Sequence, residues 1–379
     1  MKPLRFVGFK VWQVVVPADP LVISSGAGPA PTWPEMPICL VEGETDAGFT
    51  AVGECGRGEG AEGVERSLRE LLGRDLTTLS PRTCWPSWNQ PSGLPSAFVE
   101  GSWAGAAGRS YAILETLWLD AIGQHAGLPA HRLLGGAVRD RVPVDFWANR
   151  PGAAQLEELV ERARALGLRG MKLKCGADGD TVHALAVAAA RAPEGFHFTV
   201  DPMCAWRNFH DARELLSILS GLGRDIRLED PFPHDALGEW QRAREAFPRL
   251  TYVFHARDDA GLRRALAAGV GDVFNLNGSG VVDIPRVAAI SQFHGKDCWI
   301  GSALELGVLQ HARLHAAATA PACTLPCDFQ SEWVRSHTLV EARMRYENGA
   351  ALVPNAPGLG VRLDHDAVAR HRVHQWTVE

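Results

Sequence analysis

Several features that would define other classes of protein are missing from this chain of 379 residues. It has no run of lysine and arginine and its formal net charge is -6, so nothing in its charge suggests nucleic-acid binding. No apolar stretch approaches the roughly 20 residues that a membrane-spanning helix needs. The N-terminus leads into an alternating strand pattern instead of the apolar core of a signal peptide. We therefore expect a cytoplasmic protein with no nucleic-acid or membrane partner.

A framework of paired cysteines is also missing. The eight cysteines are scattered, and most lie within apolar strand patterns. Cys323 and Cys327 are four positions apart, but no second pair accompanies them, which argues against a zinc knuckle. We expect reduced thiols that pack as small apolar side chains.

The sequence does contain two differently patterned halves. Hydrophobic residues make up 46% of the chain and charged residues 22%, which is ordinary for a soluble globular protein. The first 125 residues mix strands and helices. A strand is expected over 7–16, a hairpin over 38–54, and amphipathic helices over 63–72 and 110–122. This half is predicted to be an α+β domain.

From about residue 142 strands and helices alternate regularly. The clearest helix covers 153–166, with apolar residues on one face and charged residues on the other, and another covers 306–320. The eight expected strands end at Asn149, Lys174, Asp201, Glu229, His255, Asn277, Ser302 and Asp328. Eight strands with seven intervening helices predict a parallel barrel over 126–350. The tail, 351–379, is expected to return to the N-terminal domain.

Charged residues stand where these strands end. Lys172 and Lys174 are two apart, so both side chains point to the same face of one strand. Packing explains one buried lysine as an ion-pair partner, but two beside carboxylates are harder to explain. We expect desolvation and mutual repulsion to lower the pKa of a lysine here and make it usable as a base.

Two carboxylates follow on the next two strands, Asp201 and Glu229. Either one alone is explained by helix capping or a strand-end salt bridge. Together, on adjacent strands of a barrel, they form a good site for a hard divalent cation.

These residues belong to a longer series of motifs that occurs in order along nearly the whole chain. The series is Gly53-Glu54, 117–121, 133–136, Lys172, Lys174, Asp201, Glu229-Asp230-Pro231 and Gly301-Ser302-x-x-Glu305. With it the chain resembles the enolase superfamily, in its mandelate racemase and muconate lactonizing enzyme branch.

The resemblance implies an α/β fold, with a capping domain over 1–125 and a (β/α)7β TIM-like barrel. It also implies a homo-oligomer and a small carboxylic acid as substrate. A divalent metal, Mg²⁺ by resemblance, binds the substrate carboxylate, Lys174 removes the adjacent proton, and Lys172 helps to neutralise the carboxylate. This chemistry is the general one of the superfamily. Its physical basis is the stabilisation of charge that develops on two carboxylate oxygens.

The strand-five residue departs from the family pattern. A carboxylate is expected as third metal ligand, and the position falls on His255. Histidine suits Zn²⁺, Mn²⁺, Fe²⁺ or Ni²⁺ better than Mg²⁺. Alternatively, Asp258 or Asp259 supplies the ligand, the site has lost one ligand, or His255 has a role without metal.

A second departure concerns the opposite rim. Racemising members carry a second base at the end of strand six or seven, where this chain has Asn277 and no histidine. Asparagine cannot act as a base but can hydrogen-bond a substrate. A one-base reaction, cycloisomerisation or dehydration, is therefore favoured. Met203, two residues after Asp201, argues mildly against a polyhydroxylated substrate.

Substrate contacts are expected from both halves of the chain. From the barrel we expect Asn277, Ser302, Glu305 and Asn149. Arg150 is expected either to meet a second carboxylate or to form a salt bridge at the barrel end. The segment 19–37 resembles the loop that covers the site in this family, with Trp33, Ser24 and Ser25 as candidate contacts.

Two other functions compete with this interpretation. Residues 58–63 match G-x-G-x-x-G, but the preceding strand belongs to a hairpin and no parallel strand follows, which disfavours a dinucleotide-binding oxidoreductase. If His255 and Asn277 mark a decayed site, the protein binds a carboxylate without turnover. Retention of both lysines and both acids favours an enzyme.

Overall fold

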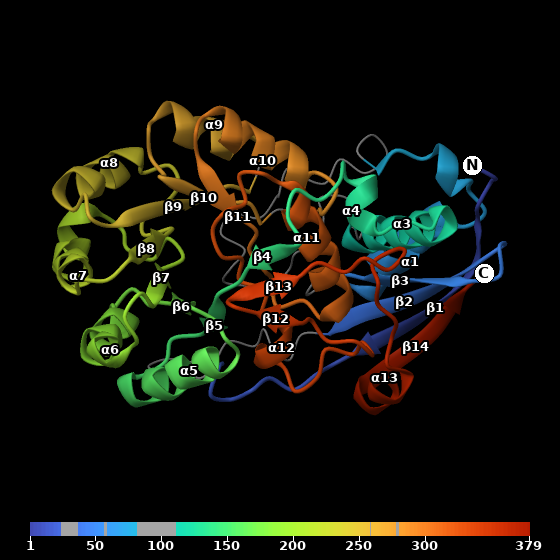
Figure 1. Cartoon of the computed structure of the whole chain (residues 1–379), viewed down its shortest axis with the longest axis horizontal. Helices are drawn as coiled ribbons and strands as arrows, with labels where there is room; N and C mark the ends of the chain where they lie inside the picture. The colour runs from blue at the N-terminus through green and yellow to red at the C-terminus, as the bar shows by residue number, and fades with distance from the viewer. Residues whose placement is uncertain (24–36, 57–58, 82–110, 258, 278–279) are drawn as a thin grey trace.

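The computed structural model describes residues 1–23, 37–56, 59–81, 111–257, 259–277 and 280–379. Trp33, Ser24, Ser25 and Asp258 therefore lie outside the described residues. An antiparallel sheet occupies one end of the molecule, where both termini lie, and a curled parallel sheet ringed by helices occupies the other (Figure 1).

The antiparallel sheet has the order β14-β1-β2-β3. Its strands are β1 (Phe6–Val14), β2 (Ile38–Thr45), β3 (Thr50–Glu54) and β14 (Arg372–Val378). The predicted hairpin is confirmed, since β2 pairs antiparallel with β3 across a turn where Gly48 has a φ of 81°. Glycine adopts this left-handed conformation without the steric cost of a Cβ. The antiparallel pairing is also inconsistent with a dinucleotide-binding βαβ unit at residues 58–63.

Three helical segments accompany this sheet, α1 (Ala61–Leu71), η2 (Leu76–Thr78) and α3 (Tyr111–Ala126). Helix α3 packs along β3. The last strand, β14, pairs with β1, so the C-terminal segment completes a sheet begun at the N-terminus. The domain boundaries themselves stay a prediction.

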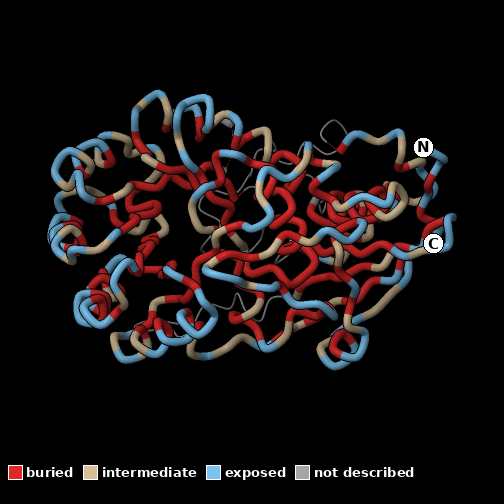
Figure 2. The backbone as a smooth tube through the Cα atoms, in the orientation of Figure 1, coloured by how far each residue is buried: buried red, intermediate tan, exposed pale blue. Residues whose placement is uncertain are grey.

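The parallel sheet contains seven strands in the order β11-β10-β9-β8-β7-β6-β5. They are β5 (Phe146–Ala148), β6 (Gly170–Lys174), β7 (His197–Asp201), β8 (Ile226–Glu229), β9 (Thr251–His255), β10 (Val273–Asn275) and β11 (Asp297–Trp299). Nearly every residue of these strands is buried, as Figure 2 shows in red. Burial on both faces is typical of a parallel sheet covered by helices.

The predicted eighth strand is reduced to two isolated bridges. Cys323 bridges in parallel to Cys298, and Cys327 bridges in parallel to Val144. Hydrogen bonds from Cys298 N to Ala322 O and from Asp145 N to Cys327 O accompany these bridges. This segment spans from β11 to the residues before β5, and the predicted (β/α)7β fold is confirmed.

Helices alternate with the strands around the barrel. In the described part of the chain they are α5 (Ala153–Ala165), α6 (Asp180–Ala188), α7 (Phe209–Gly221), α8 (Leu237–Ala246), α9 (Asp259–Ala267), α10 (Ile284–Phe293) and α11 (Gly307–Thr319). In α5 the buried residues are Leu156, Leu159, Val160 and Ala163, which recur at helical spacing. Every residue of α11 is buried, because this helix packs against both α10 of the barrel and β3 of the antiparallel sheet.

Short elements complete the fold. A small sheet has the order β12-β13-β4, from β4 (Arg141–Pro143), β12 (Tyr346–Glu347) and β13 (Ala350–Leu352). The remaining helices are α4 (Ala130–Leu133), η3 (Ala189–Arg191), α12 (Ser331–Val334) and α13 (His365–His371). Among the described residues, no helix combines the length and apolar character that crossing a membrane requires.

Candidate active site

The charged residues predicted from the strand ends come together at one end of the barrel. Lys172 and Lys174 lie in β6, and Asp201 and Glu229 are the last residues of β7 and β8. Lys174 is in register with Asp201 across the parallel ladder. Because parallel strands deliver their carboxyl ends to the same edge, all four buried side chains meet there.

Lys172 is at the centre of this group. Its Nζ lies 2.8 Å from Glu229 Oε2, 3.1 Å from Asp328 Oδ2 and 3.5 Å from Asp201 Oδ2. Lys174 forms an ion pair with the same Asp201 oxygen. One carboxylate therefore faces both ammonium groups. The indole ring of Trp299 lies 5.9 Å from Lys172 Nζ and adds a weaker cation–π contact.

The charge of Lys172 suits the neutralising role that the resemblance implies for it. Burial lowers the pKa of Lys172, but the carboxylates of Asp328, Glu229 and Asp201 outweigh that effect and raise it well above its ordinary value. The expected depression of a lysine pKa is therefore wrong for Lys172. This side chain stays an ammonium group, which suits it to neutralising a substrate anion and not to accepting a proton.

Asp328 belongs to this group, and the sequence did not single it out as a site residue. It had been identified as the end of the eighth strand, which is the only signal that could have found it. Its side chain is buried beside Lys172, and burial raises its pKa. Its second oxygen, Oδ1, is buried and accepts no hydrogen bond from the residues that the structure describes.

Glu229 also faces Lys172. Its Oε1 accepts hydrogen bonds from Lys172 Nζ and Asn275 Nδ2, each at 2.9 Å. Its Oε2 is buried, and its contact among the described residues is the ion pair with Lys172 Nζ at 2.8 Å. Burial, reinforced by nearby Asp201, raises the pKa of Glu229 to about 8. An ionised Glu229 thus calls for more positive charge than the lysines supply.

His255 occupies the strand-five position as a buried imidazole. Its Nε2 lies 3.3 Å from Asn277 O, and because a carbonyl only accepts, Nε2 carries the proton. Burial, followed by Arg257, lowers the pKa of His255 to about 3, so the ring is neutral. Its Nδ1 lone pair then lies 4.0 Å from Glu229 Oε1 and 3.8 Å from Asp230 Oδ2.

These donors fit a divalent cation. A neutral Nδ1 and two carboxylate oxygens repel one another as lone pairs unless a positive charge lies between them. Buried carboxyl oxygens without hydrogen bonds point to the same need. Glu229 and His255 are close enough to share such an ion, but among the described residues no ligand atom of Asp201 lies within 4.8 Å of both, so Asp201, Glu229 and His255 as one ligand set stay a prediction. The alternative ligands, Asp258 and the side chain of Asp259, lie outside the described part of the chain.

Asn277 has its amide group fixed by the protein. Its Nδ2 donates to Ser302 O at 3.0 Å, and its Oδ1 accepts from Arg313 Nη1 at 2.7 Å. Gly301, which follows β11, lies so close to Asn277 that a larger residue would clash there. A Cβ at Gly301 would lie 2.9 Å from Asn277 Cβ. One N–H of this amide and one lone pair of its oxygen have no bond among those described here, so a polar contact to substrate stays a prediction.

Two other predicted contacts, Glu305 and Ser302, bond within the protein. Glu305 Oε2 accepts from Ala303 N at 2.6 Å, and its Oε1 lies 3.5 Å from Arg313 Nε. Ser302 Oγ accepts from Gln330 Nε2 at 2.9 Å. Both residues help to fix the loop between β11 and α11.

The two residues after β5 differ from each other. Asn149 is buried, and its backbone N donates to Val22 O. Arg150 Nε lies 2.8 Å from Asp180 Oδ2, and Arg150 Nη2 lies 3.2 Å from Asp178 Oδ1. Of the two roles expected for Arg150, the barrel-end salt bridge is the one observed.

Glu54, from the first motif of the resemblance, joins the two halves of the molecule. Its Oε1 accepts from Leu306 N at 2.5 Å and its Oε2 from Leu309 N at 2.9 Å, both at the start of α11. The preceding Gly53 packs on α3, where a Cβ would lie 2.7 Å from Leu117 Cγ. This motif therefore fixes the antiparallel sheet to the barrel.

Comparison with known proteins agrees with this arrangement. A family profile described as "Enolase C-terminal domain-like" matches residues 155–367, more than half of the chain. The chain belongs to the enolase superfamily, in its mandelate racemase and muconate lactonizing enzyme family.

Individual relatives in the enolase superfamily cover most of the chain. A probable glucarate dehydratase of Streptomyces coelicolor is 28% identical, over 97% of this chain and 91% of its own length. Muconate cycloisomerase 1 of Acinetobacter baylyi is 26% identical, over 69% of this chain and 72% of its own length. An enolase of Pseudomonas fluorescens Pf0-1, solved with bound magnesium, potassium and tartrate, superposes with a TM-score of 0.79 at 20% identity, covering 98% of this chain and 92% of that one. The relatives are enzymes, and the solved structure shares the fold.

Proposed function

We propose that this protein removes the proton α to the carboxylate of a small organic acid, as a metal-dependent isomerase or dehydratase that uses one base. The observation that carries the proposal is the convergence of Lys172 and Lys174 on Asp201 and Glu229 at one rim of the barrel. The dehydratase and cycloisomerase relatives support the reaction class.

Each lysine has a separate role in this proposal. Lys174 first gives up one proton to solvent. Its neutral Nζ then accepts the α-proton, so a C–H bond breaks and an N–H bond forms, while Asp201 stabilises the resulting ammonium group. Lys172 keeps its positive charge throughout, because three carboxylates surround it, and it faces the substrate carboxylate. Two roles for two neighbouring lysines follow from their different partners.

Asp201, Glu229 and His255 would hold the divalent cation. When bound, the cation supplies positive charge that stabilises the negative charge developing on the substrate carboxylate. Magnesium is the choice that the Pseudomonas fluorescens structure supports. Manganese or zinc becomes the better choice if His255 is a ligand, because an imidazole nitrogen is a softer donor than a carboxylate oxygen.

A single base is proposed because Asn277 stands two residues after β10, where racemising relatives would carry a second base. Its amide cannot take up a proton, and it is held by Arg313 and Ser302. Cycloisomerisation and dehydration both need only one residue to remove the α-proton, whereas racemisation through two faces needs two. Asn277, Ser302, Glu305, Asn149 and Trp33 stay predicted substrate contacts.

The proposal is tested by hydrogen exchange at the α-carbon. Acid sugars, N-acylated amino acids and lactones would be incubated with the protein and Mg²⁺ in deuterated water and followed by NMR. We expect exchange with one class, abolished in Lys174→Ala and retained in Lys296→Ala, a matched lysine outside the site. Undiminished exchange in Lys174→Ala would remove Lys174 as the base.

The same experiment separates catalysis from simple binding. A carboxylate that binds in calorimetry, yet exchanges no proton with the wild-type protein at any metal concentration, would identify a binding protein without turnover. Circular dichroism of Lys174→Ala must match the wild type for the comparison to stand.

A further inference from the structure

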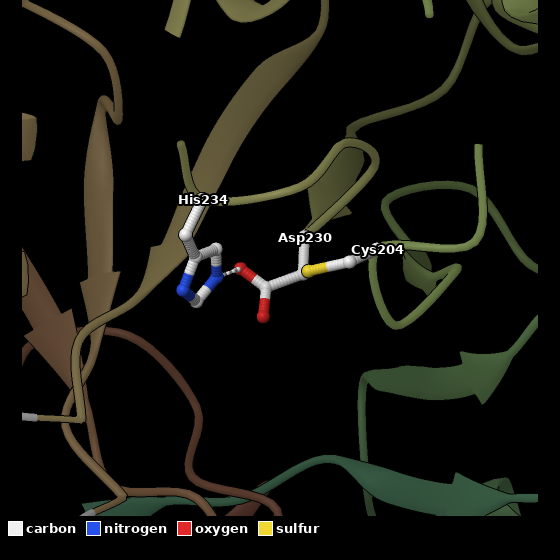
Figure 3. Close-up of side chains that lie close together, drawn as sticks. All are labelled: Cys204, Asp230 and His234. Carbon is white, nitrogen blue, oxygen red and sulfur yellow. Dashed lines mark hydrogen bonds and ion pairs between the residues drawn. The ribbon is translucent and has the colours of Figure 1, made fainter. Parts of the chain in front are cut away.

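A second group of metal-ligating side chains lies beside the candidate active site. Cys204 follows β7 and lies three residues after Asp201, while Asp230 and His234 follow β8. One ligand atom from each of the three lies within 4.8 Å of the other two. Figure 3 shows Asp230 between His234 and Cys204, with the imidazole turned toward the carboxylate.

The positions of these three side chains are well defined by their neighbours. His234 Nε2 lies 2.8 Å from Asp230 Oδ1, and the imidazole stacks on Phe254 with a centroid distance of 4.3 Å. Cys204 N donates to Asp230 O at 2.6 Å, which ties the two loops together. These contacts fix the imidazole of His234 and connect the loops after β7 and β8, and the sulfur of Cys204 takes part in none of them.

The backbone at two of the three residues is unusual. Cys204 has a φ of 61° and Asp230 a φ of 44°, in the left-handed region that residues other than glycine rarely adopt. Such conformations cost free energy and persist where the surrounding structure imposes them. Here they accompany the arrangement that brings the thiol and the carboxylate near each other.

The chemistry of the three donors selects a particular kind of ion. A thiolate and an imidazole are ligands for Zn²⁺, whereas Mg²⁺ prefers oxygen alone. A tetrahedral zinc ion with bonds of about 2.0–2.3 Å separates its ligand atoms by about 3.3–3.8 Å. The observed separations, from 2.8 Å to within 4.8 Å, bracket this range, so small side-chain shifts suffice.

Asp230 uses its two oxygens toward different neighbours. Oδ1 faces His234, whereas Oδ2 lies 3.8 Å from His255 Nδ1 and 3.9 Å from Arg257 Nη2. Arg257 thus competes with a cation mainly for Oδ2. Oδ1 lies with the imidazole of His234 and also accepts a hydrogen bond from the backbone N of His255 at 3.0 Å, so a zinc ion would bind Oδ1 through its remaining lone-pair direction.

We propose that Cys204, Asp230 and His234 bind a zinc ion as three protein ligands, with water in the fourth position. Binding releases the thiol proton to solvent and leaves a thiolate on the metal. The ion would join the loops that follow β7 and β8, directly behind Asp201 and Glu229. The zinc site shares no ligand with Asp201, Glu229 and His255, although Asp230 contacts His255. The tests below measure zinc binding and not α-proton exchange, so either proposal can fail without the other.

Cobalt spectroscopy tests the thiolate ligand directly. We expect Co²⁺ added to metal-free protein to give a sulfur-to-cobalt charge-transfer band in the near ultraviolet, because an oxygen and nitrogen site gives none. The band should vanish in Cys204→Ser and persist in Cys175→Ala, which removes a buried thiol on the neighbouring strand end. A wild-type protein with no such band, or a band of equal strength in Cys204→Ser, would overturn the proposal.

Zinc retention tests the whole ligand set. After dialysis against excess Mg²⁺, we expect one zinc ion per chain in the wild type and in Cys175→Ala, measured by inductively coupled plasma mass spectrometry. Cys204→Ser and His234→Ala should each lose at least 90% of it while keeping the wild-type circular dichroism. Equal zinc content in all four proteins, or none in any, would contradict the site.

Discussion

Two buried glutamates, Glu54 and Glu229, end strands in different halves of the molecule. Burial raises the pKa of each to about 8. Glu54 ends β3 and gives both oxygens to backbone amides at the start of α11. Glu229 ends β8, and its two oxygens lie 2.9 Å and 2.8 Å from Lys172 Nζ. The same residue type, equally buried, has entirely different partners.

The difference shows that a perturbed pKa does not by itself mark a functional residue. Backbone amides at the N-terminus of a helix are fixed donors, so Glu54 is a structural link between the antiparallel sheet and the barrel. The ammonium group of Lys172 lies on a flexible side chain, so it is a less rigid partner for Glu229 than two backbone amides are for Glu54. What distinguishes Glu229 in the candidate site from Glu54 is its partner, which is a lysine ammonium group instead of backbone amides.

The largest expected effect comes from neutralising Glu229. We predict that Glu229→Gln lowers the α-proton exchange rate by on the order of 10²–10³-fold, because a charge that positions the cation is lost. The free energy of unfolding of the metal-free protein should change by less than about 1 kcal/mol, since Lys172 keeps Asp328 and Asp201. Exchange kinetics and urea unfolding measure the two. If Glu229→Gln exchanges the α-proton at the wild-type rate, Glu229 does not differ from Glu54 in its role in the reaction.

Removing Glu54 should produce the opposite pattern. In Glu54→Ala the amides of Leu306 and Leu309 lose their acceptors in a buried place, which costs about 2–4 kcal/mol of unfolding free energy. Glu54→Gln keeps one carbonyl acceptor and should cost less. Urea denaturation measures both. If exchange at substrate saturation falls as far as in Glu229→Gln while the unfolding free energy is unchanged, Glu54 is not a structural link.

Metal addition should separate the two glutamates without any substrate. A ligand that binds only the folded state at 100 times its Kd stabilises it by about 2.7 kcal/mol. We therefore expect Mg²⁺ or Mn²⁺ to raise the thermal midpoint of the wild type and of Glu54→Gln, measured by calorimetry. In Glu229→Gln the increase should disappear. An equal increase in all three proteins would place the cation elsewhere.

The smallest effect concerns His311, on the helix that Glu54 caps. Burial lowers the pKa of His311 to about 4, so the folded state holds the neutral ring and its stabilisation is complete above the unfolded pKa near 6.5. It is lost as pH falls from 6.5 through about 4, at up to about 1.4 kcal/mol per pH unit.

The variant His311→Asn should lose less unfolding free energy than the wild type as the pH falls from 7 to 4, measured by urea titrations. His374→Asn, which changes an exposed histidine, should behave like the wild type. Equal slopes in all three proteins would mean that His311 does not report on the packing of α11.

Much of the fold was predictable because its signals are local. The apolar face of α5 and the hairpin of β2 and β3 depend on residues within a few positions of one another. The eighth strand was only partly predictable. Cys323 and Cys327 form single bridges to opposite neighbours, and nothing in the local sequence shows that the ladder is so short.

The candidate site was predictable where it depends on strand ends. Lys172, Lys174, Asp201 and Glu229 were identified in this way, and they meet. Asp328 was not, because its contact with Lys172 exists only when the last barrel segment closes the ring. The zinc-binding group proposed at Cys204 likewise depends on two loops that meet in space.

The sequence alone determined which chemical groups reach the rim, because the two-residue period of a strand and the direction of parallel strands leave little choice. Tertiary structure decided their charge and orientation. Lys172 remains an ammonium group because three carboxylates from other segments of the chain surround it. His255 turns Nδ1 toward Glu229 because Nε2 donates a hydrogen bond to Asn277 O. Electrostatic interactions depend on distance through space, which the order of residues along the chain does not encode.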